Sequence, residues 1–178
     1  KKMLEDMEFK VESDHSIVNH KYHSTFSSLF THATRLSFAK IGIGDDITAA
    51  RKLVHFLGHN CKVLTDLDMS GNPQMALPLD EWATVTAQLE LERLCLDQCT
   101  GVLGDVSCLI AAELLTDLSL KHTRISGNVG SFAALTNIIM LDLQDTNVTG
   151  DVTPLAGLVR LKELKLQRTM VSGDVGLL

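Results

Sequence analysis

Aromatic side chains are scarce in this sequence: they make up 4% of its 178 residues, with one Trp and one Tyr. Basic residues are outnumbered as well, with 16 Lys and Arg against 22 Asp and Glu, so the net charge is −6. Binding to nucleic-acid phosphates needs a basic surface, and this balance argues against that class of partner. No apolar run approaches the roughly 20 residues needed to span a bilayer, and the first residues show no signal-peptide pattern.

Hydrophobic residues make up 45% of the chain and recur with a fixed period in its last third. The segments LLTDLSLKHTRISGNV, NIIMLDLQDTNVTGDV and RLKELKLQRTMVSGDV align without a gap, and their head leucines (Leu118, Leu141 and Leu164) are 23 residues apart. The shared pattern is L-x-L-x-x-T-x-(V/I)-x-G-(D/N)-V. A period in the low twenties is typical of solenoid proteins.

The alternating leucines of each repeat suit a short strand with one buried face. A single strand of this kind cannot bury its leucines alone, so neighbouring repeats must stack into a continuous core with parallel strands. The Thr three residues after the second leucine, as at Thr146, is expected to satisfy loop backbone groups with its hydroxyl. The repeated glycine, as at Gly150, supplies a positive φ where the chain turns away from the sheet.

This spacing and these residues resemble the leucine-rich repeat (LRR) family. The S/T-G-(D/N)-V segment is most similar to its plant-type variant, with the repeat L-x-L-x-x-(N/T)-x-(L/V)-S-G-x-(I/V). The resemblance implies an α/β solenoid with a curved parallel β-sheet on the concave side and helices or irregular segments on the convex side. It also implies that the function is recognition of a partner, without naming that partner.

The earlier units are longer and less regular. Counting from Leu36, successive head leucines are 31, 27, 24, 23 and 23 residues apart. We expect a helix capped by Thr48 that runs to Leu57, and a second helical segment over residues 80–92. Shorter helical runs are expected to be capped by Ser107 and Thr153.

The domain organisation follows from these units. Residues 1–31 do not repeat and are expected to form an N-terminal capping segment, helical over residues 16–30; residues 32–178 form an array of about six units. The sequence opens at Lys1 and stops inside a repeat at Leu178. We therefore expect an incomplete C-terminal end that further protein or a partner covers. A targeting segment removed before Lys1 is compatible with this start.

Candidate binding residues flank the strand leucines and are expected to face the concave surface. The charged members of this set are Arg35, Asp66, Asp68, Arg93, Asp97, Asp117, Lys121, Asp142, Lys165 and Arg168. Tight interfaces usually have aromatic or arginine anchors, and no aromatic residue flanks these leucines. The pattern indicates a polar, salt-sensitive docking face; an ordinary solvated sheet face is the alternative.

No pattern indicates catalysis, a metal or a cofactor: G-x-S-x-G and H-E-x-x-H are both absent. A column of acidic or amide residues precedes the Val or Ile that re-enters the core (Asp46, Asp105, Asn128, Asp151 and Asp174). Local backbone bonding at turns is favoured there over calcium binding. The pair His20-x-x-His23 is interpreted as a polar helix face because the sequence places no third ligand. Trp82 is interpreted as a core residue, with a partner-binding anchor as the alternative.

Four cysteines are present, and their spacing matches no zinc pattern of paired C-x-x-C motifs. Extracellular members of the family that the chain resembles carry clustered cysteine pairs in their end caps, and none appear here. We therefore expect four free thiols and an intracellular, reducing compartment. An organelle reached through a removed targeting segment fits as well.

These patterns together predict a non-enzymatic protein–protein interaction module that binds a partner protein through the LRR surface. The alternative is an accessory subunit held in a larger assembly by its convex side and its ends. A receptor would bury the concave columns in its complex, whereas an accessory subunit would bury the outer segments.

Overall fold

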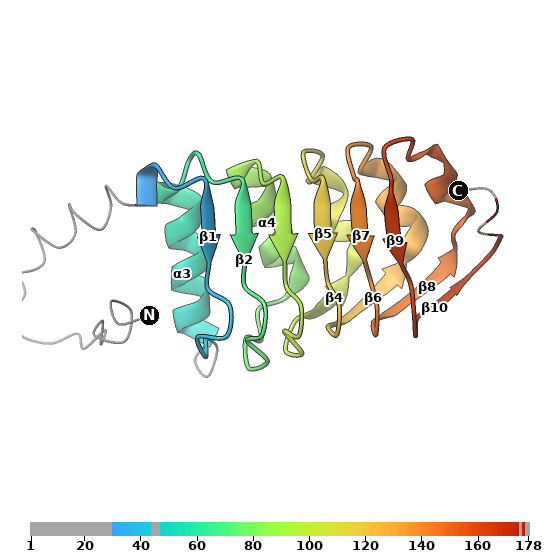
Figure 1. Cartoon of the computed structure of the whole chain (residues 1–178). Helices are drawn as coiled ribbons and strands as arrows, with labels where there is room; N and C mark the ends of the chain where they lie inside the picture. Colours follow the sequence, from blue (N-terminus) through green and yellow to red (C-terminus); the bar gives the residue numbers. More distant parts are fainter. Residues whose placement is uncertain (1–29, 44–46, 175, 177–178) are drawn as a thin grey trace, which may run out of the picture.

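Six short parallel strands form one sheet, in the order β1 (Arg35–Ser37), β2 (Asp66–Asp68), β3 (Arg93–Cys95), β5 (Asp117–Ser119), β7 (Met140–Asp142) and β9 (Glu163–Lys165). A computed structural model of the chain describes residues 30–43, 47–174 and 176. In Figure 1 these strands run side by side along the whole array. The head leucines pair with one another across every step, as Leu118 does with Leu141, so each repeat adds one strand in the predicted register.

A second parallel sheet follows the turn in the later units. It consists of β4 (Leu103–Asp105), β6 (Arg124–Asn128), β8 (Asn147–Asp151) and β10 (Met170–Ser172), paired in that order. The glycine of each repeat lies within or just after these strands with positive φ, 100° at Gly150. The positive φ was predicted, but the turn at this position is part of a second ladder that the sequence pattern did not indicate.

The segments that return from strand to strand change from α-helices to short 3₁₀ helices along the chain. They are α3 (Ile47–Asn60), α4 (Leu79–Leu89), η1 (Val106–Ala111), η2 (Val129–Ala134) and η3 (Thr153–Gly157). Figure 1 shows them behind the strands of the six-stranded sheet. The shortening follows the repeat length, because the units of 24 and 23 residues leave fewer residues for the return.

The predicted helix ends were partly wrong. Helix α3 begins at Ile47 and passes through Gly58 to Asn60, because the buried Gly58 backbone lies against Gln88 of α4 and has no side chain to exclude it. At η1 the cap is Asp105, whose carboxylate accepts the Ser107 N–H, so Ser107 is not the cap.

Thr153, likewise, is the first residue of η3 and not its cap. The residue before it, Val152, has no capping side chain, and the Thr153 N–H donates to the Asp151 carboxylate. In both of these returns the Asp that follows the repeat glycine supplies the acceptor.

The core runs continuously under the strands, as predicted. Leu118, Leu120, Leu141 and Leu143 are fully buried, and so is Trp82, which makes it a core residue. Leu164 and Leu166 are only partly buried, contrary to the prediction, because β9 is the last strand of the sheet and no further described unit covers them.

A buried polar column supports the loops after the strands. The hydroxyls of Thr123 and Thr146 donate to backbone carbonyls three residues earlier, as predicted. Asn72 at the same position is fully buried; its Oδ1 accepts the Gly42 and Ile43 N–H groups, and its Nδ2 donates to two carbonyls. Cys99 replaces the Asn in the next unit, buried with its Sγ 3.2 Å from the Met69 carbonyl oxygen.

The predicted N-terminal capping segment lies almost entirely outside the described residues, which begin at Phe30. Among the residues that the structure does describe, no helix is both long and apolar enough to cross a membrane.

Candidate functional site

The candidate site is the open face of the six-stranded sheet, by which we mean the face that carries the first and third residue of each strand. Seven of the ten predicted site residues lie on these strands, at the first or third position, in rows that run across the repeats. These seven are Arg35, Asp66, Asp68, Arg93, Asp117, Asp142 and Lys165. Asp97 lies two residues past the end of β3. Lys121 lies just past β5, and Arg168 lies in the loop after β9.

Four of these residues form a continuous chain of ion pairs along the first row. Asp66 Oδ1 lies 3.1 Å from both the Arg35 and the Arg93 guanidinium, and Arg93 also reaches Asp117 at 3.3 Å. Burial raises the pKa of Asp66, but the Thr65 hydroxyl and the two guanidiniums together lower it below its ordinary value. These charges therefore neutralise one another within the chain, and each exposed pair contributes little to stability.

Two carboxylates near the centre of the face lack such a partner. Asp68 accepts the Ser37 hydroxyl at 3.0 Å and the Ser70 N–H at 2.9 Å. Asp97 accepts the Ser119 hydroxyl and the Lys121 N–H. No cation forms an ion pair with either carboxylate within the described part of the chain. Neutral donors thus hold both groups in place and leave their charge uncompensated.

The thiol of Cys95 is close enough to both carboxylates for their negative charges to affect it. Asp68 pairs with Cys95 across the β2–β3 ladder, and Asp97 follows it by two residues. Burial raises the pKa of Cys95 to about 12, and the negative charges of Asp97 and Asp68 add to this. Because the thiolate is the reactive form, this cysteine is a poor nucleophile.

Asp142 is a correction to the predicted set, because its side chain is not available to a partner. It is 6% exposed. Its Oδ1 accepts the Gln144 N–H at 3.1 Å, and Lys165 lies 3.7 Å from its Oδ2. Lys165 belongs to the next strand, β9, and its long side chain lies close to Asp142. The burial of Asp142 therefore depends on packing between strands and could not be predicted from its place in the sequence. Lys165 itself stays partly exposed and also reaches Glu163.

A further row of polar residues was missed in the sequence. It consists of the residues directly before the Thr/Asn/Cys column (Ile41 in the first unit). Five of them are polar and one is Gly71, and all have left-handed backbone with φ between 54° and 69°: Lys40, Gly71, Gln98, His122, Asp145 and Arg168. In the last units they form a cluster in which Asp145 binds the Arg168 guanidinium through two oxygens and lies 3.2 Å from His122 Nδ1.

The Arg168 hydrogen bond, with further help from the Arg168, His122 and Lys121 charges, lowers the pKa of Asp145. Only Arg168 of this row was among the predicted site residues. The row could have been identified from the sequence, because its residues always come one position before the Thr/Asn/Cys column.

The acidic column after the repeat glycines is structural. Asp105, Asn128, Asp151 and Asp174 each accept the backbone N–H two residues on, at 2.7–2.8 Å, so the predicted local bonding is confirmed. Asp46, the remaining member of the column, lies outside the described residues. In the described part of the chain, no three His, Cys, Asp or Glu side chains gather into a group that could hold a metal.

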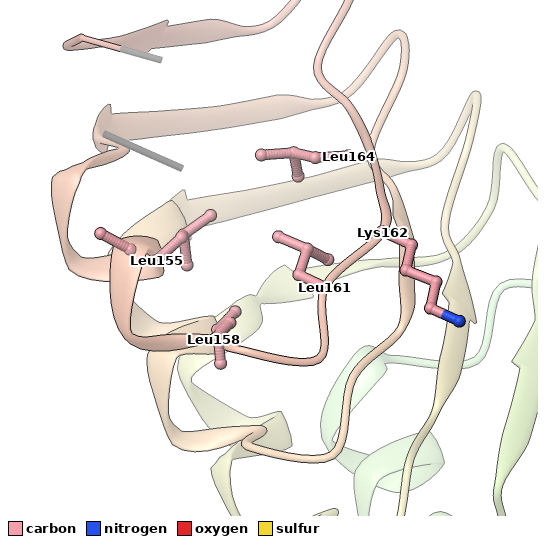
Figure 2. A pocket seen from close by; sticks show the side chains of 6 residues that line it. Leu155, Leu158, Leu161, Lys162 and Leu164 are labelled. Atoms are coloured by element: carbon pink, nitrogen blue, oxygen red, sulfur yellow. The ribbon is translucent and has the colours of Figure 1, made fainter. Parts of the chain in front are cut away.

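Two hollows of the surface lie at the C-terminal end of the array. The larger one, of about 190 Å³, is lined mainly by leucines of the last unit. Figure 2 shows Leu155, Leu158, Leu161 and Leu164 around it, with the Lys162 side chain directed away. It exposes the end of the core. Among the described residues that line it, none carries a carboxylate, imidazole or thiol that could act as acid, base or nucleophile.

Solved structures with this architecture are leucine-rich repeat proteins. The LRR ectodomain of the plant receptor kinase GASSHO1/SCHENGEN3 from Arabidopsis thaliana, solved with CASPARIAN STRIP INTEGRITY FACTOR 2, is 22% identical with a TM-score of 0.52, and the match covers 72% of this chain and 15% of that one. Internalin C2 from Listeria monocytogenes is 22% identical with a TM-score of 0.55, over 85% of this chain and 78% of that one.

A third match, TLR13 in complex with ssRNA13, has 19% identity and a TM-score of 0.56, over 83% of this chain and 21% of that one. This chain therefore spans only a small part of the length of the two receptors. No protein-family model matches the sequence, and no curated protein matches it either. At these identities the likeness concerns the fold alone: the chain is an α/β leucine-rich repeat solenoid, as predicted.

Proposed function

We propose that this chain is a non-enzymatic protein-interaction module whose open face binds a partner protein presenting a lysine or arginine side chain to Asp68 and Asp97. One observation carries the proposal: these two carboxylates are held by neutral donors and have no cation among the described residues. Most other charges of the face are already paired within the chain. A partner cation that reached them would gain a charge-assisted hydrogen bond in a partly desolvated place.

The fold supports this proposal in a general way. Solenoids present an extended sheet surface to partners, and the Arabidopsis ectodomain with this fold was solved with a bound partner. We also propose that the repeats belong to the plant-type variant, which the S/T-G-(D/N)-V segments of the second sheet support.

Site-specific crosslinking tests which surface binds. A photo-crosslinking amino acid is placed at Ser70, on the open face, or at Ile110, on η1. In the native cell extract, the partner captured through Ser70 should be lost when Asp68 and Asp97 are both changed to Asn, because the cation then loses its counter-charge. Glu113→Gln, at an exposed position on the other side, should leave capture unchanged. Capture that is equal in the double variant contradicts the proposal.

An accessory-subunit role is the second candidate, and exposed apolar side chains on the return segments favour it. Ile110, within η1, is 53% exposed, and Leu114, three residues after η1, is 47% exposed. A subunit held by this side would be crosslinked from Ile110 and not from Ser70. The same experiment therefore separates the two candidates.

We further propose that the chain works in an intracellular, reducing compartment. All four cysteines are free; Cys61 and Cys99 are buried, and burial raises the pKa of Cys99 to about 11 and of Cys108 to about 11. Alkylation of the unfolded protein, isolated from its source under acid trapping, should add four labels per chain. Fewer labels without prior reduction would contradict this compartment.

A further inference from the structure

Helix α3 carries two exposed histidines, His55 and His59, four residues apart. Residues at this spacing are neighbours on one helix face. Their ring centroids are 5.9 Å apart, and the ring planes are inclined by 31°. Two histidines at this spacing on one helix face are the arrangement with which H-E-x-x-H proteins hold zinc.

The hydrogen bonding of His59 prepares it as a ligand. Its Nδ1 lies 2.9 Å from the backbone carbonyl oxygen of His55. A carbonyl oxygen only accepts, so Nδ1 carries the proton and donates it, and the lone pair of the neutral ring is on Nε2. Metal-binding histidines usually donate their other ring N–H to a carbonyl or carboxylate in this way, which fixes the tautomer and the ring orientation.

The surroundings of the two rings tolerate a cation although α3 is rich in basic residues. Arg51 is paired with Glu81 at 2.7 Å, and the Lys62 ammonium donates to the Gly58 carbonyl at 2.6 Å. The rings lie toward the C-terminal end of the helix, where the unpaired carbonyl groups favour positive charge. No described His, Cys, Asp or Glu adds a third ligand, so water or a small chelate has to fill the other positions.

We propose that His55 and His59 form a two-histidine site for a divalent late first-row transition-metal ion, with Cu(II) bound most tightly. Imidazole nitrogens suit Cu, Ni and Zn, and the stability order places Cu²⁺ above Ni²⁺ and Zn²⁺. In such a site the ion would lie about 2.0–2.1 Å from each ligating ring nitrogen. The residue after His55 is Phe56, where H-E-x-x-H enzymes have their Glu base, so the site binds a metal without hydrolytic chemistry.

Calorimetric titration of the untagged 178-residue chain with Cu(II), Ni(II) and Zn(II) tests the site. Loss of an outer-shell partner typically costs about 10–100-fold in metal affinity, and loss of a ligand should cost at least as much. His55→Gln and His59→Gln should therefore each weaken Cu(II) binding by about tenfold or more. Because only the folded helix places both rings together, Cu(II) should raise the melting temperature of the parent and not of either variant.

The controls address three of the other five histidines of the chain. His122→Gln, a change in the cluster with Asp145, should bind Cu(II) like the parent. His20→Gln and His23→Gln test the remaining closely spaced pair. Binding that survives in both α3 variants, or that disappears with His20 or His23, overturns the proposal. Melting temperatures without metal should be equal for all variants at these exposed α3 positions, which separates loss of the site from loss of the fold.

Discussion

The side-chain oxygen of Asn128 lies 2.5 Å from the point that a Cβ on Gly150 would occupy. The same oxygen accepts the Gly130 N–H at 2.8 Å. One side chain thus begins the return segment of its own unit and packs against the glycine of the next unit. The same relationship joins Asp105 to Gly127 at 2.6 Å, so it is a repeated contact between units.

The stacking contact predicts that Gly150→Ala destabilises the protein. The new methyl would collide with Asn128, and a φ of 100° is unfavourable for Ala. We expect a loss of about 1–3 kcal/mol in the free energy of unfolding. Gly157→Ala is the matched control, because no atom lies within 4 Å of its added Cβ. Urea unfolding of both variants measures the difference; equal stabilities would contradict the contact.

The position of a leucine along the array decides how much its truncation costs. Leu141 is fully buried in the middle of the sheet, and Leu141→Ala should cost about 2–5 kcal/mol. Leu166 is partly exposed beside the open end, so Leu166→Ala should cost less. Chemical denaturation of both variants under the same conditions compares their losses in the free energy of unfolding. A larger loss for Leu166→Ala than for Leu141→Ala would show that another chain covers that end.

Asn72 is expected to be the most sensitive polar position. Asn72→Ala leaves the Gly42 and Ile43 N–H groups and the Phe38 and Met69 carbonyls without this partner. Each buried group left unpaired costs about 1–3 kcal/mol. We therefore expect a loss of about 3 kcal/mol or more, together with faster hydrogen exchange of the Gly42 and Ile43 amides. Unchanged exchange at these two amides would show that the side chain is not their protection.

The protein should lose stability in acid. Burial raises the pKa of both Asp66 and Asp68, but hydrogen bonds, and guanidiniums at Asp66, lower each below its ordinary value. The unfolded chain therefore binds more protons than the folded chain just below about pH 4, so the free energy of unfolding falls there as the pH falls. Asp66→Asn should show a weaker decline than the parent between pH 5 and pH 2, and Glu113→Gln should match the parent, with thermal melts as the measurement.

Only part of the candidate site could be predicted from the sequence. The strand-flanking residues were identified correctly as a surface because side chains alternate along a strand, and Asp66 and Arg93 lie where that rule puts them. The burial of Asp142 and the cluster of His122, Asp145 and Arg168 were not identified. Both depend on which long side chain of the next unit crosses over a given residue, and sequence spacing carries no information on that.

The sequence by itself determined the repeat, its register and its core, because a 23-residue period of leucines can be buried in only one way: by stacking like strands side by side. The tertiary structure alone decided the second sheet, the change from α-helix to 3₁₀ turn, and which charges pair. These depend on distances between units, such as that from Asn128 to Gly150, and such distances arise only once neighbouring repeats have packed together. The uncompensated charge of Asp68 and Asp97 belongs to the same class, since a carboxylate is left without a cation only by the arrangement of every unit around it.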